Sequence, residues 1–96
     1  MHSKSTREYE IEEYLVAQAR ARGGDAIKLR PPKGRGFPDR TVILPGGWVA
    51  FVEVKRPTGG VTAKHQTAWG VTLTTCGQRF YVVSSFADVD RVFASV

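Results

Sequence analysis

The sequence predicts a single α/β domain spanning residues 1–96, with a central mixed sheet flanked by helices. Three observations predict this class. Apolar residues make up 42% of the chain, which is typical of globular proteins. Apolar positions recur with helical spacing near both ends and with strand-like alternation in the middle. Turns rich in glycine and proline separate these segments, and the expected order is α-β-β-β-α-β-α.

The first expected element is a helix that ends at Gly23-Gly24. Ser5 or Thr6 can cap its start, because their side-chain oxygens accept hydrogen bonds from backbone N–H groups of the first turn. Three apolar residues recur at a spacing of four and should face the core: Ile11, Leu15 and Ala19.

The middle of the chain predicts three strands. Residues 26–30 alternate between apolar and polar and read as a short strand. The segment 31–38, with three prolines and two glycines, must be a loop. Residues 41–44 and 48–55 are apolar runs on either side of Pro-Gly-Gly at 45–47, which is a β-hairpin pattern.

The last third predicts a helix over residues 62–76, a strand and a final helix. We expect Cys76 to be buried, as free cysteine usually is. The strand, residues 79–83, is apolar on both faces, so we expect it in the centre of the sheet, parallel to a neighbour. Ser84 or Ser85 can cap the final helix. The residues expected to pack inward from this helix are Val89, Val92 and Phe93.

The charge is unevenly distributed. The net charge is +5, but residues 20–64 hold ten basic and three acidic residues, a balance of +7. Such a block suggests a polyanionic partner, most often nucleic acid, although a solvated basic surface is the alternative.

The chain contains no apolar run near the roughly 20 residues that span a bilayer, so we expect no membrane partner. The first fifteen residues lack the apolar stretch of a signal peptide, which indicates a cytoplasmic protein. Cys76 is the only cysteine, which excludes an internal disulfide and a cysteine-based zinc site.

Three charged residues lie at the ends of the hairpin strands. Glu53 and Lys55 are two residues apart in one strand, so their side chains share a face. Asp39 precedes the other strand. Asp39 lies seven residues before Gly46, and Glu53 lies seven residues after Gly46. The hairpin should therefore bring the two carboxylates nearly opposite each other.

Two carboxylates about 4 Å apart repel by roughly 4 kcal/mol at an effective dielectric near 20. This exceeds the roughly 0.2–1 kcal/mol that a favourable cross-strand pair contributes. Lys55 offsets part of the repulsion, and a divalent cation such as Mg²⁺, which prefers carboxylate oxygens, offsets more. The pattern therefore indicates metal-dependent phosphodiester hydrolysis, with an exposed charge cluster at a strand end as the alternative.

The ordered set of residues resembles a known family. Residues 36–39 (Gly-Phe-Pro-Asp), the hairpin, and residues 51–55 (Phe-Val-Glu-Val-Lys) are similar to the PD-(D/E)xK nuclease superfamily, and most of all to its VRR-NUC (virus-type replication-repair nuclease) branch. The resemblance covers nearly the whole chain. It implies a restriction-endonuclease-like αβββαβα fold.

The resemblance also implies roles for individual residues. Asp39 and Glu53 would be metal ligands, together with the backbone carbonyl of Val54. Lys55 would be the catalytic lysine. Gln66, on the helix after the lysine strand, would lie near the site.

The family carries a further glutamate on its first helix, about three residues before an aliphatic core residue. Glu8 stands three residues before Ile11 and is our choice for this catalytic carboxylate, contacting the metal through water. Glu12 lies one turn later on the same face and is the alternative.

The resemblance implies a structure-selective DNA endonuclease of phage or bacterial type that uses Mg²⁺, with Mn²⁺ as a substitute. Stand-alone members of this branch resemble phage or bacterial enzymes that act as homodimers on branched DNA in repair, so we expect a Holliday-junction resolvase. The alternatives are a flap or restriction-like nuclease and a DNA-binding module without catalysis. Five basic residues flank the site in sequence and are candidates for phosphate contacts: Lys33, Arg35, Arg40, Arg56 and Lys64.

Overall fold

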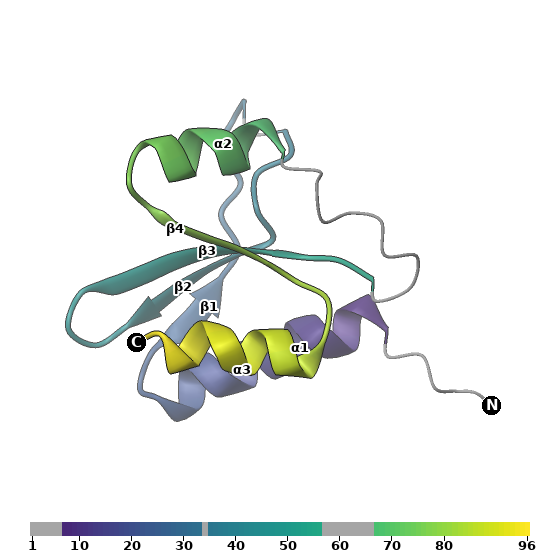
Figure 1. The fold of residues 1–96 in the computed structure, drawn as a ribbon, viewed down its shortest axis with the longest axis vertical. Helices are drawn as coiled ribbons and strands as arrows, with labels where there is room; N and C mark the ends of the chain where they lie inside the picture. Colours follow the sequence, from purple (N-terminus) through teal and green to yellow (C-terminus); the bar gives the residue numbers. More distant parts are fainter. Residues whose placement is uncertain (1–6, 34, 57–66) are drawn as a thin grey trace.

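The computed structural model describes residues 7–33, 35–56 and 67–96. These residues form three layers (Figure 1), with α2 on one face of the sheet and α1 and α3 side by side on the other. The order along the chain is the predicted α-β-β-β-α-β-α. The elements are α1 (Glu8–Ala21), β1 (Asp25–Ile27), β2 (Arg40–Leu44), β3 (Trp48–Val54), α2 (Ala68–Thr75), β4 (Arg79–Val83) and α3 (Phe86–Ala94).

The sheet is mixed, as predicted. Its order is β1-β2-β3-β4, with antiparallel pairing throughout the first three strands and parallel pairing of β4 with β3. The prediction that β4 is central was wrong, because β4 lies at the edge. Its apolar residues have another cause: α2 packs on one face of β4 and α3 on the other.

The predicted hairpin and its register are confirmed. Leu44 pairs with Trp48 across a turn in which Gly46 and Gly47 have positive φ values of 85° and 80°. At the far end of the hairpin, Arg40 pairs with Val52. One further step of the same register puts Asp39 opposite Glu53.

The main core lies between the sheet and the α1–α3 layer. Burial alternates along β3, whose even-numbered residues face this core, so Glu53 points to the opposite face. The predicted inward-facing residues of α1 and α3 are confirmed, and they pack with β-strand valines. The cluster includes Ile11, Leu15, Ala19, Val42, Val52, Val54, Val89, Val92 and Phe93.

α1 has Arg7 at its N-cap, where the Glu10 carboxylate accepts a 2.8 Å hydrogen bond from the Arg7 backbone N–H. The predicted caps, Ser5 and Thr6, lie outside the described residues. The predicted glycine stop is confirmed. Gly24 N–H donates to the Ala19 carbonyl at 3.0 Å, after Gly23 with a φ of 87°.

β1 is shorter than the predicted strand 26–30. It ends at Ile27, which pairs with Thr41. Because β2 begins at Arg40, the same register leaves at most Lys28 opposite a β2 residue, and Leu29 and Arg30 opposite none. Residues 28–39 consequently form a long connection between β1 and β2. This connection supplies Asp39 and, as described below, the walls of a pocket.

α2 begins at Ala68, where the Thr67 hydroxyl accepts a 2.9 Å hydrogen bond from Gly70 N–H. The predicted start at Thr62 lies outside the described residues. Cys76 is exposed, so its predicted burial was wrong. It is the C-cap residue of α2, beyond the face that Gly70 and Leu73 bury.

α3 starts as predicted, because Ser85 Oγ accepts a 3.0 Å hydrogen bond from Asp88 N–H. Across the described parts of the chain, no helix has the length and apolar character that crossing a membrane requires.

Candidate active site

Asp39 and Glu53 come from the two strands of the hairpin. Asp39 directly precedes β2, and its Oδ2 accepts a 2.7 Å hydrogen bond from the backbone N–H of Val54. Glu53 is the last but one residue of β3, on the face away from the main core. The hydrogen bond fixes the aspartate against the strand segment that carries Glu53.

Glu53 lies in an electrostatically unfavourable position for a carboxylate. Its pKa is raised above the ordinary value, first by burial and then by the negative charge of Asp39, with a smaller contribution from Glu8. Lys55 opposes this shift, since its Nζ lies 3.3 Å from Glu53 Oε2. The Glu53 side chain is only 13% exposed, so water screens the repulsion poorly.

The two candidate glutamates of α1, Glu8 and Glu12, have different surroundings in the structure. Glu8 is exposed in the first turn, and its charge acts on Glu53. Glu12 instead forms an ion pair with Arg40, in which Nε lies 2.7 Å from Oε2, and a longer one of 3.8 Å with Lys28. The Glu12 carboxylate therefore serves an internal ion pair, and Glu8 is the helix glutamate whose charge reaches the carboxylate pair.

Arg40 is held by internal contacts rather than presented to solvent. Besides its bond to Glu12, its Nη1 donates a 2.8 Å hydrogen bond to the backbone carbonyl of Ala26. The side chain is 21% exposed. The parity of Arg40 with the buried residues Val42 and Leu44 explains this, because all three share the face of β2 that α1 covers.

The other predicted site residues lie as follows. Val54 is buried, with its backbone N–H bonded to Asp39. Lys33 and Arg35 are exposed on the β1–β2 connection, and Arg56 is exposed just after β3. Gln66 and Lys64 lie outside the described residues.

An aromatic cluster that the sequence analysis missed lies beside the site. Phe37 packs edge-to-face on Phe51 of β3, with ring centroids 5.9 Å apart, and on Trp69 of α2 at 4.9 Å. Phe37 lies two residues before Asp39, so these contacts help to fix the loop that carries the aspartate. The available signal was an aromatic residue within an otherwise polar Gly/Pro loop, since such a residue needs a buried partner.

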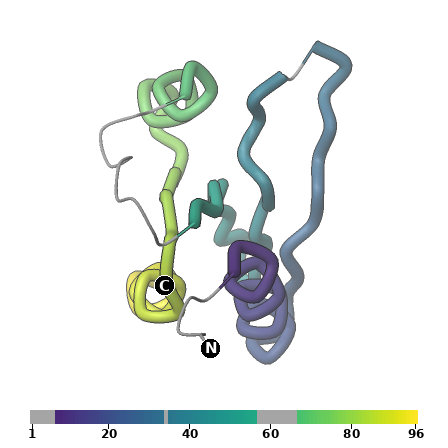
Figure 2. Tube along the Cα trace, turned by 90° about the vertical axis from the view of Figure 1, so that its right-hand side faces the viewer, coloured from purple at the N-terminus to yellow at the C-terminus, as the bar shows by residue number. Residues whose placement is uncertain are grey.

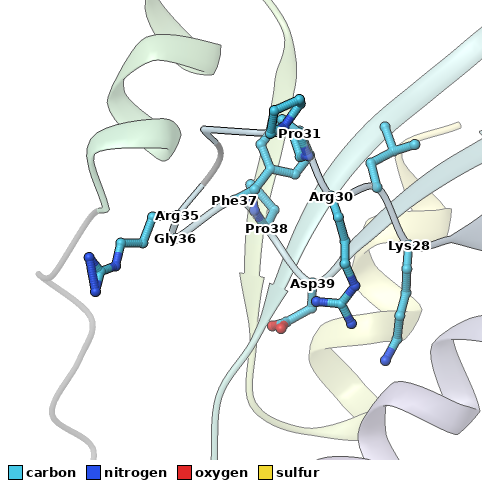
Figure 3. Close-up of a pocket in the computed structure, with 10 residues that line it drawn as sticks. Lys28, Arg30, Pro31, Arg35, Gly36, Phe37, Pro38 and Asp39 are labelled. Carbon is cyan, nitrogen blue, oxygen red and sulfur yellow. The ribbon is translucent and has the colours of Figure 1, made fainter.

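A pocket of about 440 Å³ adjoins Asp39 (Figure 3). Both limbs of the β1–β2 connection line it, residues 28–32 on one side and 35–39 on the other. Lys28 and Arg30 belong to its lining, and the sequence analysis did not single them out.

Comparison with known proteins finds similarity both in sequence and in structure. No family model matches the chain. The chain is 40% identical over 90 residues to "Putative nuclease p44" of Acyrthosiphon pisum secondary endosymbiont phage 1, which covers 94% of this chain and 95% of that protein. A solved structure described as "VRR_NUC domain" has a TM-score of 0.81 at 34% sequence identity, covering 93% of this chain and 96% of that one.

This chain belongs to the VRR-NUC family. The family and the restriction-endonuclease-like fold predicted from the sequence are thereby confirmed. Both matches span nearly the whole chain, so the similarity is not confined to the hairpin that carries the charged residues.

Proposed function

We propose that this VRR-NUC domain is a Mg²⁺-dependent endonuclease that hydrolyses phosphodiester bonds in branched DNA. The observation that carries the proposal is the hairpin register, which sets Asp39 opposite Glu53 with Lys55 3.3 Å from Glu53. Family membership and the name of the phage relative support nuclease activity.

The oxygen atoms of the Asp39 and Glu53 carboxylates and of the Val54 carbonyl suit a hard divalent cation. Glu53 and Asp39 repel each other in a half-buried position, and Lys55 offsets only part of that repulsion, so the pair retains unbalanced negative charge. In the described ranges no three His, Cys, Asp or Glu side chains cluster as a metal site. Two carboxylates, the backbone carbonyl of Val54 and several waters would suit Mg²⁺, with Mn²⁺ as a substitute.

The chain's own groups divide the chemistry between them. Asp39 and Glu53 hold the cation and orient the phosphodiester relative to it. When bound, Mg²⁺ supplies Lewis-acid chemistry to the phosphodiester and to the attacking water. Lys55 orients that water and stabilises negative charge that develops on the phosphate oxygens. Its position beside Glu53 keeps the ammonium within the site.

Two further residues support this arrangement in the proposal. Glu8 acts as the outer carboxylate that contacts the cation through water, because its charge already reaches Glu53 while Glu12 is bound to Arg40. Gln66 belongs to the site by the family resemblance alone. The residues that contact DNA phosphates in this proposal are Lys33, Arg35 and Arg56, which are exposed, and Lys64.

The proposed substrate is a four-way junction cut by a homodimer in phage or bacterial DNA repair. One chain carries one set of Asp39, Glu53 and Lys55, whereas resolving a junction requires two symmetric cuts. A two-fold dimer supplies both sites, and the basic block from residue 20 to residue 64 would form a shared DNA-binding face.

The test is cleavage of labelled four-way junctions, flaps and linear duplexes with Mg²⁺, Mn²⁺ or chelator, alongside sedimentation with and without the junction. We expect metal-dependent paired cuts in the junction by a dimer. A monomer that prefers flaps would overturn the resolvase proposal and leave the nuclease proposal standing. Binding of DNA without cleavage at any metal concentration would identify a non-catalytic module.

A further inference from the structure

The connection between β1 and β2 forms a pocket of its own. Figure 2 shows it rising away from the sheet and returning as two limbs. The pocket lies between residues 28–32 of the outgoing limb and residues 35–39 of the returning limb. Its lining includes Asp39, so the pocket opens directly beside the proposed catalytic carboxylates.

The polar part of the lining is cationic. Lys28 and Arg30 contribute positive charge, whereas the Arg35 side chain points away from them (Figure 3). Asp39 is the one acidic residue among the described residues of the lining. Within the ranges that the structure describes, neither Arg30 nor Arg35 forms an ion pair with a carboxylate. Lys28 is 48% exposed, at 3.8 Å from Glu12. This part of the pocket therefore suits an anion such as a phosphate.

The remaining walls are apolar and well supported. Pro31, Phe37 and Pro38 line the pocket, and Pro38 is buried. The ring of Phe37 is held by its edge contacts with Phe51 and Trp69. The volume of about 440 Å³ lies within the range of about 300–1,000 Å³ that small-molecule sites occupy, so it exceeds the needs of a lone phosphate group.

We propose that this pocket binds one unpaired nucleotide of the DNA strand, next to the scissile phosphate. Lys28 and Arg30 pair with its phosphate, while its sugar and base lie against Pro31, Phe37 and Pro38. Cations combined with an aromatic or apolar platform are the usual means of binding single-stranded DNA. A paired base is stacked within its duplex and cannot offer its face to these walls. The proposal rests on the proposed nuclease function and adds a source of its branch selectivity.

The test measures binding to two labelled DNAs of the same sequence, a blunt duplex and a duplex with a single-stranded branch, by fluorescence anisotropy in EDTA, which prevents cleavage. Wild type should prefer the branched DNA. The Lys28→Gln/Arg30→Gln double variant should lose about tenfold in affinity for the branch and little for the blunt duplex. The slope of log K against log salt should shrink by about 0.7 for each lost phosphate contact.

Arg79→Gln is the matched control. It removes an exposed positive charge outside the basic block of residues 20–64, at the start of β4, where Arg79 pairs with Ala50 rather than with the segment of β3 that carries Glu53. Its branch preference should equal that of wild type. Arg30→Gln alone leaves the Lys28–Glu12 contact intact and keeps the test valid if the double variant melts at a lower temperature.

Unchanged branch preference in the folded Arg30→Gln and double variants would overturn the pocket proposal. An equal loss for both DNAs would also overturn it, because it would indicate a site for duplex backbone phosphates. If wild-type protein cleaves DNA and the variants give either of these two results, only the pocket proposal is contradicted. Wild-type protein that cleaves no DNA with any metal contradicts the proposed nuclease function.

Discussion

The carboxylate of Asp39 accepts a 2.7 Å hydrogen bond from the backbone N–H of Val54, the residue between Glu53 and Lys55. This bond joins the loop end before β2 to the segment of β3 that carries the other two charges. The three residues of the proposed site are consequently positioned by one hairpin, although fourteen residues separate Asp39 from Glu53.

Asp39→Asn and Glu53→Gln should each reduce cleavage at least 100-fold, because each removes a proposed ligand of the cation. Both variants should fold. The asparagine can still accept from Val54 N–H, and the glutamine relieves the repulsion between the two carboxylates. The measurements are initial cleavage rates and thermal melting without metal.

Adding Mg²⁺ provides the control. A ligand at ten times its Kd stabilises a protein by about 1.4 kcal/mol, so Mg²⁺ should raise the melting temperature of wild type but not that of Glu53→Gln. Equal metal responses in the two proteins, or full cleavage by either variant, would exclude the assigned ligands.

Lys55→Ala should retain Mg²⁺ binding and lose about 100-fold or more in turnover, since removing one preorganised charge-stabilising donor commonly has this effect. Its neighbour Arg56→Ala is the comparison, because it removes one exposed positive charge outside the Glu53 pair. It should weaken DNA binding, as expected for a phosphate contact, and leave turnover at saturating DNA unchanged. Metal titration followed by turnover at saturating metal separates binding from chemistry. Weaker metal binding with normal saturated turnover would contradict the role proposed for Lys55.

The two α1 glutamates should respond in opposite ways. Glu12→Gln should reduce the free energy of unfolding by about 2 kcal/mol, because it leaves the Arg40 guanidinium, 21% exposed, without its charged partner. Cleavage per folded molecule should change little. Glu8 is exposed, so Glu8→Gln should leave stability unchanged and reduce cleavage.

Urea denaturation and cleavage assays on the same preparations check this pair of variants. If Glu12→Gln abolished cleavage in fully folded protein while Glu8→Gln did not, Glu12 would replace Glu8 as the outer carboxylate.

Asp88 gives a pH-dependent contribution to stability. Burial raises its pKa, but hydrogen bonds from the Ser84 backbone N–H, Arg91 and the Ser84 hydroxyl outweigh burial, so the pKa is lowered overall. A lowered pKa in the folded state means that the carboxylate stabilises the protein above the unfolded-state pKa, and that this stability is lost as pH falls through the folded-state value.

Asp88→Asn should therefore cost about 1 kcal/mol at pH 7, and the difference from wild type should shrink as pH falls below about 4. Denaturant titrations of both proteins at several pH values check this. A difference that stayed constant with pH would show that the Asp88 charge makes no contribution.

The hairpin and the carboxylate pair could be predicted from the sequence because both depend on local counting. Pro-Gly-Gly marks the turn, Gly46 lies at its centre, and strand alternation then fixes which residues face one another. The helix stop at Gly23 and the cap at Ser85 were predictable for the same reason, since each depends on a few neighbouring residues.

The features that the sequence did not reveal depend on contacts between distant segments. β4 has an apolar pattern that a central strand would also have, and only the positions of α2 and α3 show why an edge strand carries it. The partners of Arg40 lie fourteen and twenty-eight residues away. Because Arg40 and Val42 are two residues apart in β2, the sequence indicated that the Arg40 side chain faces inward. It did not indicate which acidic residue would pair with Arg40.

The hairpin turn has a consequence for how the protein can vary. Extra residues between Pro45 and Gly47 would lengthen an exposed loop and leave the pairing of β2 and β3 unchanged. One residue lost between Trp48 and Glu53 would instead reverse the facing of everything after it and turn the carboxylate toward the apolar core. Natural variants should therefore differ in length at the turn, while the strand segments on either side keep a constant residue count.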